Sequence, residues 1–369
     1  MGNRIDRIDT YLVPSDERPE AWCRRKAHVF VRVETSDGVV GWGEGHCLLY
    51  REHALPPLIA VLAEQLIGTE AVSMRALAHT SFHGIAEQPG GMDLYGAAAA
   101  IELALWDVYG KALGRPVYEL LGGAVHSSLP LYANIFSNHE RSDRELADKA
   151  AEQVEAGFKA VKFYPFRSGE TLSEGVDKTR ALRDAVGPDV LLAVDLWRQP
   201  APDEAREICL ALEPFNLAWV EDPFAPINAR ALRTLREQVR QPLMMGETMA
   251  RRWQFRELLE HQAVSLINPD VAATGLLEVR DIAAMAEPYQ VTVSPHNYNS
   301  MALGTAVAAH AAAGIANLGL SEYFPELAAD LDHLCSDRMV PVDGQLPLPS
   351  APGLGVRFDD EAMKAYKVS

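Results

Sequence analysis

The sequence of 369 residues has few cysteines, and none of them is placed like a structural metal ligand or a disulfide partner. The four thiols are far apart and form no Cys-x-x-Cys pair: Cys23, Cys47, Cys209 and Cys335. No apolar run approaches the length of a membrane span, and residues 1–14 lack the apolar core of a signal peptide. We therefore expect free thiols, a cytoplasmic location and no membrane partner.

Positive charge is also scarce, because 34 lysines and arginines face 51 aspartates and glutamates, for a net charge of −17. Such a chain repels phosphates, so we expect no nucleic-acid partner. Gly-x-Ser-x-Gly, Walker and zinc-spaced His/Cys motifs are all missing. The glycine-rich GWGEG at residues 41–45 is no nucleotide-binding loop, because one residue rather than two separates its second and third glycines.

Residues 1–125 have the pattern of a few strands followed by helices. The stretch HVFVRVETSDGVVGWGEG alternates apolar and polar residues around Ser36-Asp37-Gly38, which is a hairpin signal. Residues 55–68 and the Ala-rich residues 96–114 then show helical spacing. We expect an α+β module here.

From residue 129 onward, short apolar runs alternate with amphipathic helical stretches. Each run ends in polar residues: LPLYANIF, AVKFY, VLLAVDLW, LAWVED, PLMMGET, SLINPD, VTVSPH and LGLSEY. Eight strands alternating with helices predict an α/β fold with a parallel barrel over residues 126–345. The Pro/Gly-rich residues 346–369 are expected to leave the barrel and complete the first module.

The polar residues that close these runs are evenly spaced. Six of them follow one another at intervals of 23 to 26 residues, and Lys162 precedes the first by 33: Asp195, Glu221, Glu247, Asp270, His296 and Glu322. One strand–helix unit has about this length, so these residues are expected at equivalent strand ends around one mouth of the barrel. In such barrels the carboxyl ends of the strands carry the chemistry.

Three consecutive members of this series are carboxylates. Asp195, Glu221 and Glu247 would repel one another strongly if all were ionised at one rim. A divalent cation relieves that repulsion, and ligands made only of oxygen suit Mg²⁺. Zinc is disfavoured because no His or Cys joins the set. The two next strands supply Asp270 and His296, which could form a hydrogen-bonded dyad with a basic imidazole nitrogen.

These motifs, taken together, resemble those of the enolase superfamily, mandelate racemase subgroup. The matching residues stand in order and at the right spacing: Lys162 in VKFY, Asp195 in VDLW, Glu221 in VED, Glu247 in GET, Asp270 in NPD, His296 in SPHN and Glu322 in SEY. The resemblance extends to GWGEG and to residues 97–123 and so covers nearly the whole chain. It implies a (β/α)7β modified TIM barrel over 126–345. It also implies an α+β capping domain over 1–125, completed by 346–369.

The resemblance implies removal of the proton α to a carboxylate, with one Mg²⁺ per active site stabilising the ene-diolate. Lys162 is then expected to contact an oxygen of a small-molecule carboxylate substrate, and protonated Glu322 to donate a hydrogen bond to it. The dyad of His296 and Asp270 acts as base, acid or both. A homo-oligomer is expected from the habit of the family.

Tyr164 departs from the family pattern, which has a second catalytic lysine at this position (Lys-x-Lys). A phenol is a poor base at neutral pH, so one-base chemistry on the His296 side is the simpler expectation. We therefore predict β-elimination of water from a sugar acid, giving a 2-keto-3-deoxy acid. Tyr164 is an acid/base, a hydroxyl donor or a pocket wall. The alternatives are a racemase, epimerase or cycloisomerase, and then a catalytically silent binding protein.

A second departure is Trp197, which stands where the family commonly has Asn near the metal, and we expect this indole to line the substrate pocket. Asn297 and Tyr298 follow the histidine and offer polar groups to a polyol. The resemblance places substrate-selecting loops of the capping domain at residues 14–22 and 45–53. Their candidate substrate-binding residues are Trp22 and His46, with Arg18 and Tyr50 beside them.

Overall fold

Eight parallel strands form a barrel in the computed structural model, which describes residues 4–15, 26–71, 74–79, 90–135, 142–166, 169–226 and 228–368. The strands are β4 (Ser128–Asn134), β5 (Ala160–Phe163), β6 (Leu191–Asp195), β7 (Val220–Glu221), β8 (Leu243–Met245), β9 (Leu266–Ile267), β10 (Thr292–Val293) and β11 (Ser321–Tyr323). From β4 to β10 each strand pairs with the next one in sequence order, and β11 pairs with β4. The Val293 N–H donates to the Asn317 carbonyl, which brings β10 against the chain that leads into β11.

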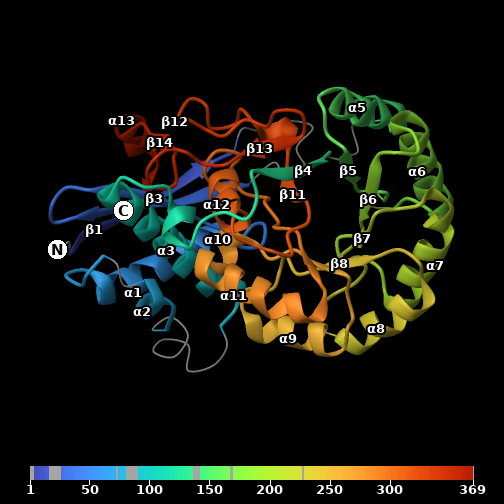
Figure 1. The fold of residues 1–369 in the computed structure, drawn as a ribbon, viewed down its shortest axis with the longest axis horizontal. Helices are drawn as coiled ribbons and strands as arrows, with labels where there is room; N and C mark the ends of the chain where they lie inside the picture. The colour runs from blue at the N-terminus through green and yellow to red at the C-terminus, as the bar shows by residue number, and fades with distance from the viewer. Residues whose placement is uncertain are drawn as a thin grey trace.

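Helices follow the first seven barrel strands and cover their outer side (Figure 1). Two of them, α5 and α6, begin with capping boxes, in which Ser142 and Thr171 exchange hydrogen bonds with the glutamate three residues later. The helices are α5 (Asp143–Glu155), α6 (Leu172–Val186), α7 (Pro202–Leu212), α8 (Ala229–Gln238), α9 (Arg252–Glu260), α10 (Val271–Thr274), α11 (Leu276–Ala286) and α12 (Leu303–Ala312). The predicted (β/α)7β barrel is confirmed.

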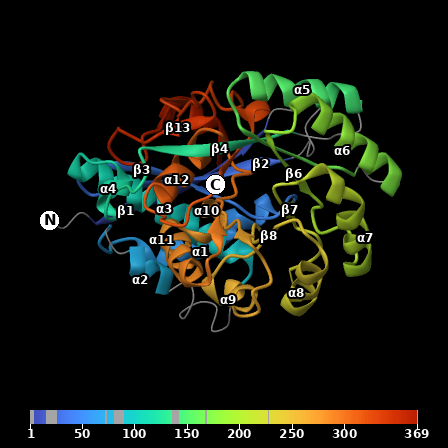
Figure 2. The same ribbon diagram turned by 45° about the vertical axis from the view of Figure 1, so that its right-hand side comes forward.

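The N-terminal residues form the predicted α+β module with an antiparallel sheet. Its strand order is β15-β1-β2-β3, with β1 (Ile5–Pro14), β2 (Ala27–Thr35), β3 (Val40–Gly45) and β15 (Lys367–Val368). The helices of this module are η1 (Glu52–Ala54), α1 (Leu55–Leu66), α2 (Met74–His79), α3 (Met92–Leu113) and α4 (Val117–Leu120). Figure 2 shows this module at one end of the barrel, away from α5–α8.

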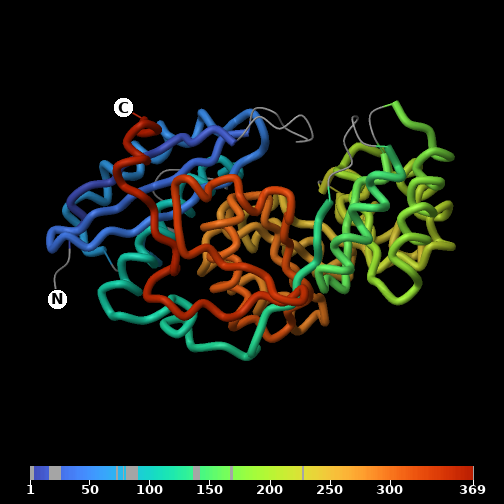
Figure 3. The backbone as a smooth tube through the Cα atoms, turned by 90° about the horizontal axis from the view of Figure 1, so that it is seen from above, coloured from blue at the N-terminus to red at the C-terminus, as the bar shows by residue number. Residues whose placement is uncertain are grey.

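The C-terminal segment runs back from the barrel to the capping sheet, where both chain ends lie on one side of the molecule (Figure 3). Val368 of β15 pairs with Thr10 of β1. The other elements here are η5 (Pro325–Leu327), β12 (Cys335–Ser336), β13 (Gln345–Pro347), β14 (Arg357–Phe358), α13 (Asp360–Met363) and η6 (Lys364–Tyr366). Because β13 still pairs with β4 of the barrel, the division at residue 346 stays a prediction.

Two short helical turns, η3 (Glu213–Phe215) and η4 (Glu287–Tyr289), end helices of the outer layer.

No helix in the described ranges is long and apolar enough to cross a membrane.

The glycines of GWGEG allow β3 to lie directly on α3. A Cβ atom on Gly43 would lie 2.0 Å from the carbonyl oxygen of Ala100, and one on Gly41 would lie 2.2 Å from that of Ala104. These contacts involve helix backbone, which cannot yield as a flexible side chain can. Strand residues alternate between faces, so Trp42 and Glu44 point away from α3.

We predict that Gly43→Ala lowers the free energy of unfolding by about 3 kcal/mol, because the added methyl forces β3 off α3. Gly91→Ala is the matched control, since Gly91 has φ −82° and open space around its Cβ position. It should cost under about 1 kcal/mol. Urea unfolding of both variants measures the difference, and equal costs would contradict the proposed packing.

Candidate active site

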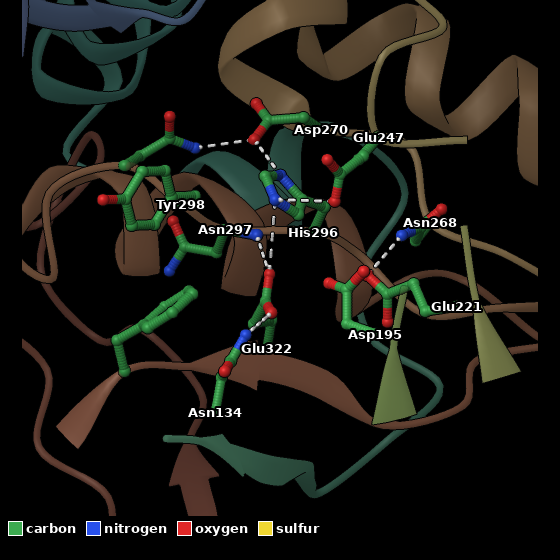
Figure 4. A network of polar contacts seen from close by, with 12 residues as sticks. Asn134, Asp195, Glu221, Glu247, Asn268, Asp270, His296, Asn297, Tyr298 and Glu322 are labelled. Carbon is green, nitrogen blue, oxygen red and sulfur yellow. Dashed lines mark hydrogen bonds and ion pairs between the residues drawn. The ribbon is translucent and has the colours of Figure 1, made fainter. Parts of the chain in front are cut away.

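The polar residues that close the barrel strands converge on one mouth of the barrel (Figure 4). The strand register sets this convergence: Asp195 pairs directly with Glu221 across β6 and β7. An isolated parallel bridge likewise joins Asp270 to His296 just beyond β9 and β10. The even spacing in the sequence therefore corresponds to one layer of side chains.

Asp195, Glu221 and Glu247 each bring a carboxylate oxygen to within 4.8 Å of those of the other two, and all three residues are buried. Burial raises the pKa of Asp195, and Glu247 raises it further while Lys162 opposes the rise. Burial also raises the pKa of Glu221 well above its usual range. The positive charge around Asp195 and Glu221 is therefore too small to offset the cost of burying their ionised forms.

Two cationic side chains reach this carboxylate cluster. The Lys162 ammonium lies 2.6 Å from Glu221 Oε1 and 3.3 Å from Asp195 Oδ2. The Arg198 guanidinium lies 2.6 Å from Glu247 Oε1 and also contacts Asp222. Burial works to lower the pKa of Lys162, but Glu221 and Glu322 outweigh it and raise that pKa well above its usual range. Lys162 is thus a permanent cation.

The donor set fits a divalent cation of the oxygen-preferring class. Three buried carboxylate oxygens lie close enough to bind one ion. The raised pKa values of Asp195 and Glu221 indicate that the protein cations alone do not fully compensate the negative charge of the cluster. The Asn268 amide and the Trp219 indole N–H donate to the two oxygens of Glu221, at 3.0 and 3.1 Å. These bonds orient the carboxylate, as outer hydrogen bonds commonly do around metal ligands.

The predicted dyad is formed. His296 Nδ1 lies 2.7 Å from Asp270 Oδ2, and the Asn299 amide donates to the same oxygen at 3.0 Å. The Ala273 N–H donates to Asp270 Oδ1, so this carboxylate also caps α10. With Nδ1 directed at a carboxylate, His296 Nε2 is the nitrogen that faces the site.

The charges around His296 favour its protonated form. Burial lowers its pKa, but Glu247 and Glu322 outweigh burial, and Asp270 adds to them, so that the pKa rises to about 10. His296 Nε2 lies 3.4 Å from Glu247 Oε2 and 3.6 Å from Glu322 Oε2. A cation bound to Glu247 removes part of that attraction and returns the imidazole toward its ordinary basicity.

Glu322 differs from expectation, because it is an ionised carboxylate in this structure. Burial acts to raise its pKa, but Lys162 at 2.8 Å and His296 lower it to about 2. Asn134 donates to Glu322 Oε1 at 2.7 Å, and the Asn297 N–H donates to Oε2 at 2.9 Å. These surroundings favour the ionised carboxylate, and the expected role of Glu322 as a proton donor to the substrate stays a prediction.

Tyr164 lies beside this group at the end of β5. The Asn134 amide is 3.4 Å from its hydroxyl oxygen. Desolvation and the Asp195 carboxylate raise the pKa of Tyr164 well above its usual range, although Lys162 opposes them. The phenol keeps its proton in this setting and can donate a hydrogen bond.

A cavity of about 270 Å³ opens at this mouth of the barrel, and Asp195, Glu247 and His296 line it. Trp197, Tyr298 and His46 line it, together with Tyr164 and His296. Desolvation, opposed by Asp270, lowers the pKa of His46 to about 4, so its imidazole is neutral. The placement of these three residues agrees with their predicted role as substrate contacts, which stays a prediction.

Of the other two predicted substrate contacts, the structure describes only Asn297, which does not line this cavity. The Asn297 side chain is fully buried, and its amide donates to Thr305 Oγ1 at 3.2 Å. Trp22 lies outside the described residues, as does Arg18 in the same loop. Tyr50, the remaining candidate from the second loop, lines the cavity.

Sequence reasoning missed three polar residues of the site. Arg198 directly follows Trp197, and both have a left-handed backbone, with φ of 62° and 48°. Bulky residues rarely adopt this conformation, and it turns the arginine back across the site. Asn134 and Asn268 stand near the ends of predicted strands, and this position is the feature of the sequence that could have identified them as site residues.

Comparison with known families agrees with this geometry. The "Enolase C-terminal domain-like" family matches residues 145–362. The "Mandelate racemase / muconate lactonizing enzyme, N-terminal domain" family matches residues 21–122. The chain belongs to the mandelate racemase/muconate lactonizing enzyme subgroup of the enolase superfamily. The resemblance found in the sequence is confirmed, and the buried carboxylate triad is consistent with a divalent-metal site typical of this superfamily.

Individual relatives of known activity are distant but cover the whole fold. The D-mannonate dehydratase of Caulobacter sp. (strain K31) is 30% identical, over 93% of this chain and 92% of that protein. The D-galactonate dehydratase of Variovorax paradoxus (strain S110) is 30% identical, over 97% and 93%. The solved 3,6-anhydro-D-galactonate cycloisomerase from Zobellia galactanivorans matches with a TM-score of 0.89 and 27% identity, over 99% of this chain and 100% of that one.

We predict that Lys162→Met lowers the free energy of unfolding by about 3 to 5 kcal/mol, because it leaves buried carboxylates without their cation. Millimolar Mg²⁺ should restore part of this loss, since a metal supplies the missing charge. The control is Lys149→Met, which removes an exposed pair with Glu152 and should cost under about 1 kcal/mol. Thermal unfolding with and without Mg²⁺ measures both effects, and a stable Lys162→Met protein would contradict the charge balance.

Proposed function

We propose that the protein is a Mg²⁺-dependent acid-sugar dehydratase. In this reaction the proton α to a carboxylate is removed, water leaves from the adjacent carbon, and the enol formed becomes a 2-keto-3-deoxy acid. The observation that carries the proposal is a cavity lined both by His296 of the dyad with Asp270 and by the protonated phenol of Tyr164, which stands where the family has a second catalytic lysine.

The dyad can serve as both base and acid. Asp270 holds the imidazole by Nδ1, so Nε2 is directed to the site and can accept the α-proton of the substrate. The electrons of the broken C–H bond then form the ene-diolate. When the 3-hydroxyl leaves, the imidazolium returns the proton to it, so that water is the leaving group. Both transfers occur on one face and require one acid/base residue.

The substrate carboxylate is expected beside the triad and Lys162. When bound to Asp195, Glu221 and Glu247, Mg²⁺ supplies positive charge that stabilises the ene-diolate. The Lys162 ammonium, which lies among three carboxylates, adds further positive charge that stabilises the ene-diolate. Glu322, which is ionised here, holds Lys162 in place.

The opposite face of the substrate favours elimination over racemisation. A racemase needs a second acid/base group there, and Tyr164 holds its proton too tightly to act as a base. A phenolic hydroxyl can still donate a hydrogen bond to the substrate or close the wall of the cavity. The relatives also support a dehydratase, because D-mannonate and D-galactonate dehydratases each align over more than nine-tenths of the chain.

The second candidate is a cycloisomerase. The observation that favours it is the likeness to the 3,6-anhydro-D-galactonate cycloisomerase, which extends over 99% of this chain. A rearrangement that begins with removal of the proton next to a carboxylate would use the same dyad and metal site. Whether the active form is the expected homo-oligomer stays a prediction.

We predict that the protein with Mg²⁺ converts an acid sugar to a 2-keto-3-deoxy acid. A panel containing D-mannonate, D-galactonate and D-xylonate, extended to other mono- and diacid sugars, tests this in D₂O. Loss of water, detected as the keto acid, supports the dehydratase. Exchange of the α-proton or rearrangement without loss of water would replace it with an isomerase.

We further predict that His296→Asn lowers kcat by at least about 10³-fold, because it removes the group that moves both protons. His310→Asn is the matched control. His310 is also buried, but it accepts a hydrogen bond from the Tyr118 N–H outside the site. Full turnover by His296→Asn, or an equal loss in His310→Asn, would overturn the assignment of the base.

A further inference from the structure

The GWGEG strand of the capping domain reaches the chain segment that follows the catalytic histidine. Its glycines face α3, so Glu44 faces the other way and is 1% exposed. Glu44 Oε1 accepts a hydrogen bond from the Ser300 N–H at 2.8 Å, and Oε2 accepts one from the Ser300 hydroxyl at 2.5 Å. His28 Nδ1, on the adjacent strand β2, lies 3.2 Å from Oε1. A buried carboxylate of one domain thus holds a serine of the other by two bonds.

Ser300 passes this restraint to the start of α12. Its hydroxyl oxygen accepts hydrogen bonds from the N–H groups of Leu303 and Gly304, at 3.0 and 3.1 Å. These N–H groups belong to the first turn of the helix, where a nearby anion is favourable. Glu44 supplies that anion through the serine, so the turn and the helix start are fixed together.

Lys26 holds the same turn from a second point of the capping domain. Its ammonium donates to the Tyr298 carbonyl and lies 3.5 Å from the centre of the Tyr298 ring. The residue between the two anchored positions is Asn299, whose amide donates to Asp270 Oδ2 at 3.0 Å. This oxygen is also the one that faces His296 Nδ1.

We propose that Glu44 is a positioning residue for the catalytic base. It fixes Ser300, the fixed turn aims Asn299 at Asp270, and Asp270 then holds His296 in the tautomer and orientation that direct Nε2 to the substrate. Glu44 is not among the residues that line the cavity of about 270 Å³, so we expect it to act through this chain of hydrogen bonds. The inference rests on the dyad being the acid/base of the proposed function.

This arrangement has a physical reason. Asp270 lies on the barrel rim between the end of β9 and α10, and it needs two donors to keep one oxygen in place for the imidazole. A barrel loop alone is a poor source of such precision, and small misplacements of a proton-transfer group cost much rate. Anchoring the loop to a rigid strand packed on α3 removes that freedom.

The first arm of the test is amide hydrogen exchange, which needs no substrate. We expect Glu44→Gln to speed exchange of the Ser300 amide and of the first turn of α12 by about tenfold, because a hydrogen bond to a buried carboxylate is lost. The matched control is Asp107→Asn. Asp107 is also a buried carboxylate of the capping domain and accepts from the N–H of Trp42 on β3, and its other partners are Lys111 and Leu354 rather than residues 298–300. Its variant should leave exchange there unchanged.

The second arm is turnover of whichever of D-mannonate, D-galactonate and D-xylonate the wild type dehydrates. Glu44→Gln should lower kcat by about 10- to 100-fold with KM within about twofold, because the base is misplaced while the substrate site is intact. Asn299→Ala should lower kcat similarly, and the double variant should lose little more, since both act through Asp270. Asp107→Asn combined with Asn299→Ala should instead behave additively.

The two arms separate failure of this inference from failure of the proposed function. If the wild type dehydrates no acid sugar, the dehydratase proposal fails, and the exchange arm still decides whether Glu44 fixes the turn. Unchanged exchange in Glu44→Gln overturns the inference. So does a Glu44→Gln variant whose kcat stays at the wild-type value, or one whose loss adds fully to that of Asn299→Ala.

Discussion

The balance of charge at one end of the barrel is the constraint on which the rest of the structure depends. Six buried carboxylates gather there: Asp195, Glu221, Asp222, Glu247, Asp270 and Glu322. Lys162, Arg198 and His296 are the cations placed among them, which leaves an excess of negative charge. Like charges this close cannot all stay ionised in a buried site without further compensation. A divalent cation on the triad would provide it, which would link the stability of the barrel rim to its chemistry.

Both domains contribute residues to this site, and the barrel contributes more of them than the capping domain. The barrel supplies the carboxylate triad and the His296–Asp270 pair from consecutive strand ends, so their positions follow from strand register. The capping domain supplies a wall of the cavity through His46 and restrains the turn after His296 through Glu44. The GWGEG strand has two roles. Its glycines permit close packing on α3, and Glu44 forms hydrogen bonds with Ser300 in the other domain.

Much of the site could be predicted from the sequence because barrel topology converts regular spacing into proximity. Asp195, Glu221, Glu247, Asp270 and His296 were identifiable in that way. Arg198 was not, since its contact with Glu247 depends on a left-handed backbone at two bulky residues, which no spacing reveals. The contact between Glu44 and Ser300 joins residues 256 positions apart in different domains. Protonation states such as that of Glu322 depend on neighbours whose distances only the structure gives.

Titration with Mg²⁺ by calorimetry tests the central claim most directly, with wild-type protein and Glu221→Gln compared under the same conditions. Glu221 is the fully buried member of the triad and contacts Lys162 at 2.6 Å. We expect one Mg²⁺ bound per chain of the wild type, and an affinity at least about tenfold weaker when this carboxylate becomes an amide. Equal affinity in the two proteins, or no saturable binding to the wild type, would contradict it.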